Sequence, residues 1–118
     1  MEAAGIIAKH ASPWNSPIVI AGKKDEATGG RAPRFCFDAR KLNAVTKKDR
    51  QPIPNINLVL AALGNGPTYY TSLDLFSGYH QMGMTERAIE KAAFTIGGFQ
   101  YAYIRMPFGL CNAPGSFQ

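Results

Sequence analysis

One aspartate stands in a setting suited to chemistry on phosphate groups. Asp74 follows a strand-like run, residues 69–73, and is followed by the small-residue pair Ser77–Gly78 and the aromatic Tyr79. Proteins hold Mg²⁺ through one or two carboxylates together with phosphate oxygens of the substrate, so a carboxylate at the end of a strand suits this ion. An isolated Asp is more often a turn or helix-capping residue, and the neighbouring residues favour the metal-binding interpretation here.

Charged side chains are expected on one face of a β-hairpin. Residues 18–21 and 34–38 have the composition of strands, and the polar, glycine-containing segment 25–31 separates them. Alternation along the second strand puts Phe35 and Phe37 on one face, which should belong to the core. The opposite face carries Arg34, Cys36 and Asp38. That face is available for binding.

A helix is predicted between the hairpin and Asp74. Asn55 can cap its first turn and Gly64 can end it. The apolar residues in between recur at helical spacing: Ile56, Val59, Leu60 and Leu63. We expect this apolar stripe to pack into the core. The basic linker that precedes the helix, residues 47–50, is expected to be irregular.

The last third of the chain predicts short elements. Residues 85–90 suggest one helical turn, and residues 94–96 and 99–105 suggest two strands. Gly97–Gly98 joins these strands, and glycines tolerate the positive φ angles of a tight hairpin turn. A final helix should start near Asn112–Pro114, with Asn112 as its cap and proline in its first turn.

Length and composition limit the class of protein. With 118 residues, 46% of them apolar, the chain is long enough for one globular domain with a core. A net charge of +5 favours an anionic partner such as nucleic acid, although a solvated surface explains the charge alone equally well. No apolar stretch is long enough for a membrane span. Cys36 and Cys111 lack zinc-site spacing, which favours two thiols over a single disulfide.

The chain resembles the reverse transcriptases of gypsy-type LTR retrotransposons, because several motifs occur in the order found in that family. The motifs are Gly5–Ile7 leading to Ser12–Pro17, Lys23–Asp25, Arg34–Asn43, Ser72–Gln81 and Met106–Gln118. The resemblance implies an α+β, right-hand polymerase fold with a fingers β-hairpin and a partial palm, an antiparallel sheet with helices on one face. The chain ends before the Tyr-x-Asp-Asp hairpin. Residues 1–118 would form a single partial domain, with about 53–81 in the palm and about 1–52 and 82–118 in fingers-type and connecting segments.

The resemblance also assigns roles to individual residues. Asp74 would hold both Mg²⁺ ions that activate the primer 3′-hydroxyl and stabilise the leaving pyrophosphate. Tyr79 would lie beneath the sugar of the incoming nucleotide and leave no room for a 2′-hydroxyl. Arg34 and either Lys23 or Lys24 would contact the triphosphate. For the two lysines alone, a solvated surface is the alternative.

Phe108 and Gly109 match the position that packs against the incoming base and sugar, where glycine lets the backbone approach closely. Four further residues are assigned to structure: Asp38, Arg40, Pro107 and Pro114. Asp38 and Arg40 are expected to form an ion pair or turn-stabilising contacts.

The implied function is RNA-directed DNA polymerisation, in which deoxynucleotides are added to a primer 3′ end during retrotransposon replication. The partners would be an RNA or DNA template with its primer, deoxynucleoside triphosphates, and downstream palm, thumb and RNase H segments of a parent polyprotein, with no membrane. The expected location is intracellular, in the cytoplasm or a virus-like particle.

Since one carboxylate of the two-ion site lies in the chain, the 118 residues alone should be inactive. The alternatives are a non-catalytic nucleic-acid-binding remnant of a retroelement and an unrelated phosphate-binding enzyme that uses Asp74 alone.

Overall fold

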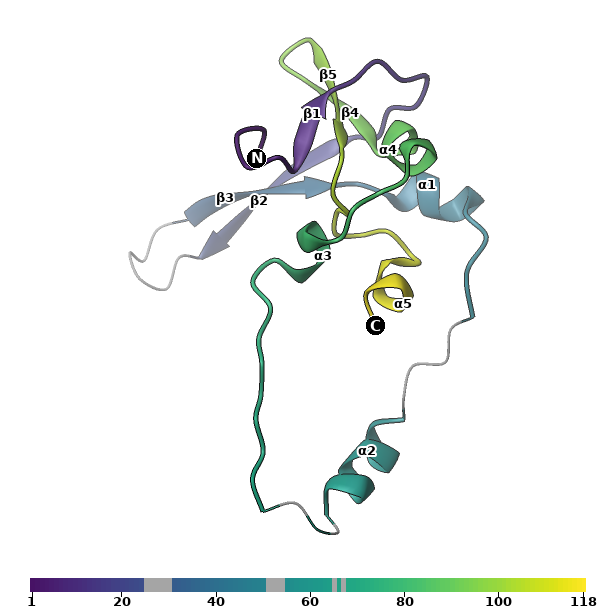
Figure 1. The fold of residues 1–118 in the computed structure, drawn as a ribbon. Coiled ribbons are helices and arrows are strands. Elements are labelled where there is room, and N and C mark those ends of the chain that lie inside the picture. Colours follow the sequence, from purple (N-terminus) through teal and green to yellow (C-terminus); the bar gives the residue numbers. More distant parts are fainter. Residues whose placement is uncertain (25–30, 51–54, 65, 67) are drawn as a thin grey trace.

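The computed structural model describes residues 1–24, 31–50, 55–64, 66 and 68–118, with the backbone alone for residues 23, 24 and 31–34. The elements in chain order are β1 (Ile7–Lys9), β2 (Ile18–Lys24), β3 (Arg31–Phe37), α1 (Arg40–Val45), α2 (Ile56–Leu63), α3 (Gly78–Gln81), α4 (Glu86–Lys91), β4 (Ala93–Ile96), β5 (Phe99–Tyr103) and α5 (Ala113–Phe117) (Figure 1). Helices are mixed with antiparallel strand pairs, so the fold is of the α+β class, as predicted.

A three-stranded sheet joins the two ends of the chain. β5 lies between β1 and β4, and both pairings are antiparallel, with Ile7 opposite Tyr103. Gly97 and Gly98 connect β4 to β5 with φ angles of 58° and 80°, as a type I′ turn requires. The two predicted strands of this hairpin are confirmed. The sequence does not predict β1, which is only three residues long.

β2 and β3 form a second, two-stranded sheet in which Ile18 pairs with Phe37. This confirms the predicted hairpin, whose tip, residues 25–30, lies outside the described residues. The Phe35 ring meets the Phe94 ring edge-on with centroids 5.4 Å apart, and Phe37 is buried. The aromatic face of β3 therefore packs into the core, as its alternation predicts.

The core lies where the two sheets meet. Its buried members are Phe37, Ala39, Ala92, Phe94 and Tyr103. Gln100 on β5 also ties down the segment before β2, because its side-chain amide accepts from Ser12 N and donates to the carbonyls of Ser12 and Trp14. The core thereby fixes the positions of β3 and β5 relative to each other.

The strand predicted over residues 69–73 does not form. These residues have no strand hydrogen bonding, and Tyr69 and Leu73 are 93% and 85% exposed. A strand requires a neighbour with which to exchange backbone hydrogen bonds, and within the described residues no strand pairs with this segment. Asp74 therefore follows an extended segment rather than a strand.

Helix α2 has the predicted bounds but not the predicted packing. The Asn55 side chain accepts a hydrogen bond from Asn57 N at 3.0 Å, which confirms the cap. No residue of α2 is buried, so the prediction that its apolar stripe enters the core is wrong. The physical reason is visible in Figure 1, where α2 lies apart from both sheets and so has no core surface to pack against.

The remaining helices are short and lie closer to the sheets. α4 confirms the helical turn predicted near residues 85–90. The sequence does not predict α1, whose N-cap, Ala39, makes no side-chain hydrogen bond. α5 begins after Asn112, as predicted, but the Asn112 side chain does not cap it. In the part of the chain that the structure describes, no helix has the length and apolar character to cross a membrane.

Candidate active site

Three residues selected from the sequence line one cavity of about 370 Å³: Asp74, Tyr79 and Phe108. The other residues of its wall are Leu73, Leu75, Gly78 and Phe117. They come from the extended segment before α3, from α3, from the loop before α5, and from α5 itself. Asp74 contributes the only charge among these lining residues. The fold thus places one carboxylate beside an aromatic pocket.

Ser77 turns the chain between Asp74 and Tyr79. Its φ and ψ angles of 49° and 44° lie in the left-handed region, which costs a non-glycine residue about 1 kcal/mol. Helix α3 starts at the next residue, and His80 N donates to Ser77 O at 2.8 Å. Because the turn is this tight, Asp74 and the Tyr79 ring reach the same cavity from consecutive segments.

The Tyr79 ring packs against the rings of two phenylalanines. Its centroid lies 5.0 Å from that of Phe108 at an interplanar angle of 47°, and 5.2 Å from that of Phe117 at 83°. Aromatic pairs prefer such tilted and edge-on arrangements. No described residue hydrogen-bonds the Tyr79 hydroxyl. Ring packing therefore sets the orientation of Tyr79.

Asp74 is exposed and has no ion-pair or hydrogen-bond partner among the described residues. An exposed carboxylate on a cavity wall is a suitable single ligand for Mg²⁺. No group of three His, Cys, Asp or Glu side chains able to hold a metal occurs within the described part of the chain. The residues present fit one protein ligand of a magnesium site and do not complete it.

The loop that carries Phe108 is tied to helix α1 by Asn43. The Asn43 side chain donates from Nδ2 to Gly109 O at 2.7 Å and accepts from Cys111 N at 2.9 Å. Gly109 has a φ of 98°, and a Cβ there would lie 3.5 Å from Phe37 O, so glycine suits the position. Pro107 is fully buried beside it. The sequence does not reveal the role of Asn43, although this residue lies in the Arg34–Asn43 motif.

Asn112 makes a similar tie on the C-terminal side of the loop. Its side chain donates to Lys47 O at 2.9 Å and accepts from Asp49 N at 3.2 Å. These bonds replace the predicted helix cap, because the Asn112 amide is already engaged by the segment after α1. The basic linker, residues 47–50, is irregular, as predicted.

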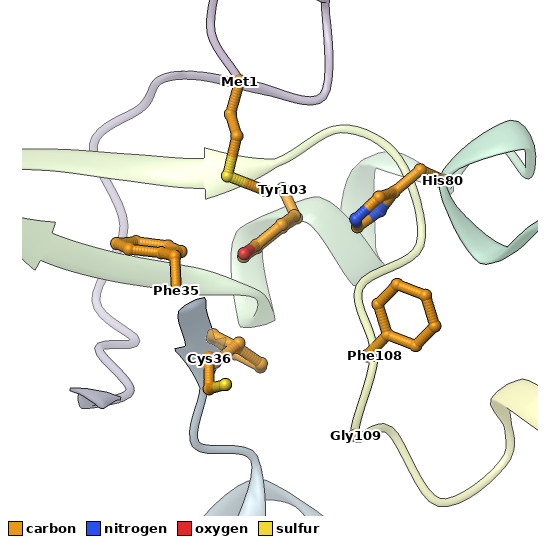
Figure 2. Close-up of a pocket in the computed structure, with 8 residues that line it drawn as sticks. Met1, Phe35, Cys36, His80, Tyr103, Phe108 and Gly109 are labelled. Atoms are coloured by element: carbon orange, nitrogen blue, oxygen red, sulfur yellow. The ribbon is translucent and has the colours of Figure 1, made fainter. Parts of the chain in front are cut away.

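His80 and Phe108 also line a second cavity of about 330 Å³, shown in Figure 2. His80 Nδ1 lies 3.1 Å from Met106 O, and because a carbonyl can only accept, Nδ1 carries the proton in this contact. The His80 ring meets the Phe108 ring edge-on with centroids 5.2 Å apart.

Burial, together with the neighbouring Cys36, raises the pKa of Tyr103 to about 12, so this phenol stays neutral at ordinary pH. Cys36 and Cys111 are half-buried, and no disulfide joins them.

Asp38 and Arg40 form the expected ion pair, with Arg40 Nη2 2.7 Å from Asp38 Oδ2. Arg40 also donates its backbone N–H to Asp38 Oδ1 at 3.1 Å. Hydrogen bonds from the Arg40 guanidinium and backbone lower the pKa of Asp38 from 3.8 to about 2. Asp38 is thus committed to stabilising the turn between β3 and α1, and it does not face the Asp74 cavity.

The predicted triphosphate contacts lie on the hairpin. Arg34 pairs with Ala21 through the backbone, and Lys23 and Lys24 lie further along β2. The side chains of these three cations lie outside what the structure describes, so their role stays a prediction.

A family model described as reverse transcriptase (RNA-dependent DNA polymerase) matches residues 22–118. The chain belongs to this family. It is 49% identical over 114 residues to the retrovirus-related Pol polyprotein from transposon opus of Drosophila melanogaster, and 45% identical over 115 residues to that from transposon gypsy of the same organism. Each match covers 97% of this chain. The gypsy-type resemblance is therefore confirmed. The chain spans 11% of the length of these relatives.

The solved structures show the same fold. The native protease–reverse transcriptase of prototype foamy virus superposes with a TM-score of 0.73 at 26% identity, covering 96% of this chain and 14% of the viral chain. A foamy viral protease–reverse transcriptase in complex with dsDNA gives a TM-score of 0.71 at 27% identity, covering 98% of this chain and 21% of the viral chain. The predicted polymerase fold is confirmed by these neighbours.

Proposed function

We propose that this chain forms the part of an RNA-directed DNA polymerase that receives the incoming deoxynucleoside triphosphate, within a longer Pol polyprotein. The observation that carries this proposal is the single cavity on whose wall Asp74, Tyr79 and Phe108 meet. A carboxylate suits the phosphate end of a nucleotide through a cation, and aromatic rings suit its sugar and base. The foamy viral enzyme complexed with dsDNA supports a template–primer duplex as partner.

Asp74 would hold Mg²⁺, which would supply positive charge against the triphosphate and lower the pKa of the primer 3′-hydroxyl. Its exposure and its lack of a competing cation among the described residues support this role. Two-ion catalysis requires further carboxylates, and the described residues provide no such group around Asp74. We therefore propose that other segments of the polyprotein complete the site and that residues 1–118 alone do not polymerise DNA.

Tyr79 would act as the floor beneath the nucleotide sugar. Its ring, packed against Phe108 and Phe117, would occupy the volume that a 2′-hydroxyl needs, so deoxynucleotides would be selected by steric exclusion. Arg34 and one of Lys23 and Lys24 would approach the triphosphate from the hairpin, as bidentate and point-charge contacts respectively.

The test is sugar selection by Tyr79→Val in the polymerase that contains these residues. Removing the ring opens space, so the ratio of ribonucleotide to deoxynucleotide incorporation should rise at least about tenfold, the change that about 1.4 kcal/mol of lost exclusion produces. Single-nucleotide primer extension with each sugar measures this ratio.

Tyr79→Phe is the matched control because it keeps the ring and removes only a hydroxyl that no described residue hydrogen-bonds. It should select sugars as the unchanged enzyme does. Equal discrimination by the valine variant and the unchanged enzyme would show that Tyr79 is a packing residue and would remove the proposed sugar site.

A further inference from the structure

Phe117 on α5 packs against the backbone of α3 more closely than any side chain at that position would allow. A Cβ added to Gly78 would lie 2.6 Å from Phe117 Cζ and 3.0 Å from Phe117 Cε2. Carbon atoms in protein interiors pack at separations of about 3.5 to 4.0 Å, so a methyl group cannot be accommodated while the ring stays in place. The Phe117 ring therefore occupies the space that a side chain at position 78 would need.

The same ring touches Tyr79, the residue directly after Gly78. The two centroids are 5.2 Å apart and the planes are nearly perpendicular, at 83°. The Tyr79 ring also contacts Phe108, whose own ring lies 5.2 Å from the His80 ring, centroid to centroid. Since no described residue hydrogen-bonds the Tyr79 hydroxyl, these two phenylalanines are the contacts that orient the ring.

Phe108 and Phe117 are not equivalent partners. Phe108 is half exposed, on a loop, and lines both cavities, so a nucleotide would contact it directly. Phe117 belongs to a helix that begins at Ala113, a residue that is 2% exposed and packed into the protein. Helix α5 thus provides the fixed side against which the Tyr79 ring rests.

We propose that Phe117 is a positioning residue for sugar selection. Its ring packs against Gly78 and sets how far the Tyr79 ring projects into the cavity that Asp74 lines. The inference rests on the proposed function, because it assigns to Tyr79 the sugar of the incoming nucleotide. Neither Phe117 nor Gly78 reacts with the substrate. Their effect reaches it through the position of Tyr79.

Phe117→Leu keeps an apolar side chain but removes the Cζ and Cε atoms that reach Gly78 and Tyr79. The Tyr79 ring then gains room to retract, and discrimination against ribonucleotides should fall by about two- to tenfold, the range expected for loss of one aromatic pair. The KM for deoxynucleotides should rise by a similar factor, whereas kcat should change little because Asp74 is untouched. Phe99→Leu is the matched control, since Phe99 is exposed on the β4–β5 hairpin and lines neither cavity.

Gly78→Ala tests the contact between Gly78 and the Phe117 ring by changing Gly78 instead of Phe117. The new methyl group should displace the Phe117 ring and reduce discrimination, whereas Gly83→Ala should not, because the nearest side-chain atom to its Cβ would be Arg105 Nη1 at 3.8 Å. In the double variant Gly78→Ala with Phe117→Leu, the clashing atoms are gone. Sugar discrimination by this double variant should therefore be at least as good as that by Phe117→Leu alone. A general loss of stability would instead make the two losses add.

The experiment is single-nucleotide incorporation by these variants in the complete polymerase, after thermal unfolding has shown that each is folded. Phe117→Met takes the place of the leucine variant if the latter does not fold. Reduced discrimination in both single variants, with no further loss in the double variant, supports the inference. Unchanged discrimination in Phe117→Leu, or additive losses in the double variant, would overturn it while Tyr79→Val still relaxes sugar selection. Unchanged discrimination in Tyr79→Val overturns the proposed function and this inference together.

Discussion

The surroundings of Asp38 and Asp74 distinguish a structural carboxylate from one for which we propose a chemical role. Asp38 receives hydrogen bonds from both the guanidinium and the backbone of Arg40, and its negative charge is matched within the turn. Asp74 has no such partner among the described residues and lies on a cavity wall. A cation in that cavity would find one carboxylate available to it, and that carboxylate is Asp74.

The Asp38–Arg40 pair predicts a pH dependence of stability. The pKa of Asp38 is lowered to about 2 in the folded chain, so the pair stabilises the fold above the ordinary pKa of 3.8 and loses that contribution as the pH falls through about 2. Arg40→Gln should lower the urea midpoint at pH 6 and lower it much less at pH 1.5, where most Asp38 is protonated in both the folded and the unfolded state.

The fluorescence of Trp14, the only tryptophan, measures this transition, because its carbonyl is held by Gln100 on β5. Lys48→Gln serves as the control for loss of a positive charge, because Lys48 is exposed and is not among the groups that lower the pKa of Asp38. A midpoint difference for Arg40→Gln that is as large at pH 1.5 as at pH 6 would mean that the pair does not act through the charge of Asp38.

At the scale of elements, the β4–β5 hairpin depends on its two glycines. Gly97 has a φ of 58°, and a Cβ there would meet no atom within 4 Å, so any cost of substitution is conformational. Gly97→Ala should destabilise the folded chain by about 1 kcal/mol, whereas Gly97→Asn should cost less because Asn tolerates the left-handed region. Urea denaturation of the two variants measures the difference, and equal stabilities would contradict the turn assignment.

Elements with local signals could be predicted from the sequence. The hairpin strands carry β-branched and aromatic residues on either side of glycine-containing segments, and α2 has Asn55 at its start and an apolar stripe. α1 escapes prediction because no side chain caps it and no residue of it is buried. β1 is a three-residue strand whose existence depends on its partner β5, which lies far away in the sequence.

The features that could not be predicted from the sequence depend on contacts between distant segments. Residues 69–73 have strand composition but no strand partner among the described residues, and the stripe of α2 has helical spacing but no buried residue. In the candidate site, motif position selected Asp74, Tyr79 and Phe108, which line one cavity. Asn43 and Phe117 were not, because their roles depend on a loop and a helix that only the folded chain brings to them.

At the scale of the whole molecule, the chain is more extended than a compact domain. Its radius of gyration is 17.8 Å, compared with about 13.5 Å expected for a compact chain of this length. Helix α2 and residues 68–76 lie away from both sheets (Figure 1), and Leu58, Tyr69 and Phe76 in these two segments are exposed. We propose that further palm segments of the polyprotein cover these two segments, which would give residues 69–73 a strand partner.

Primer extension by Asp74→Asn tests the proposed polymerase site most directly, in the complete polymerase with Mg²⁺ and a template–primer duplex. The neutral amide cannot compensate phosphate charge, so extension should fall at least about a hundredfold while duplex binding is retained. Glu2→Gln, which removes an exposed carboxylate outside the cavity, should extend primers as the unchanged enzyme does, and residues 1–118 alone should not extend them. Near-normal extension by Asp74→Asn, or none by the unchanged polymerase, would contradict the proposal that this cavity is where DNA synthesis takes place.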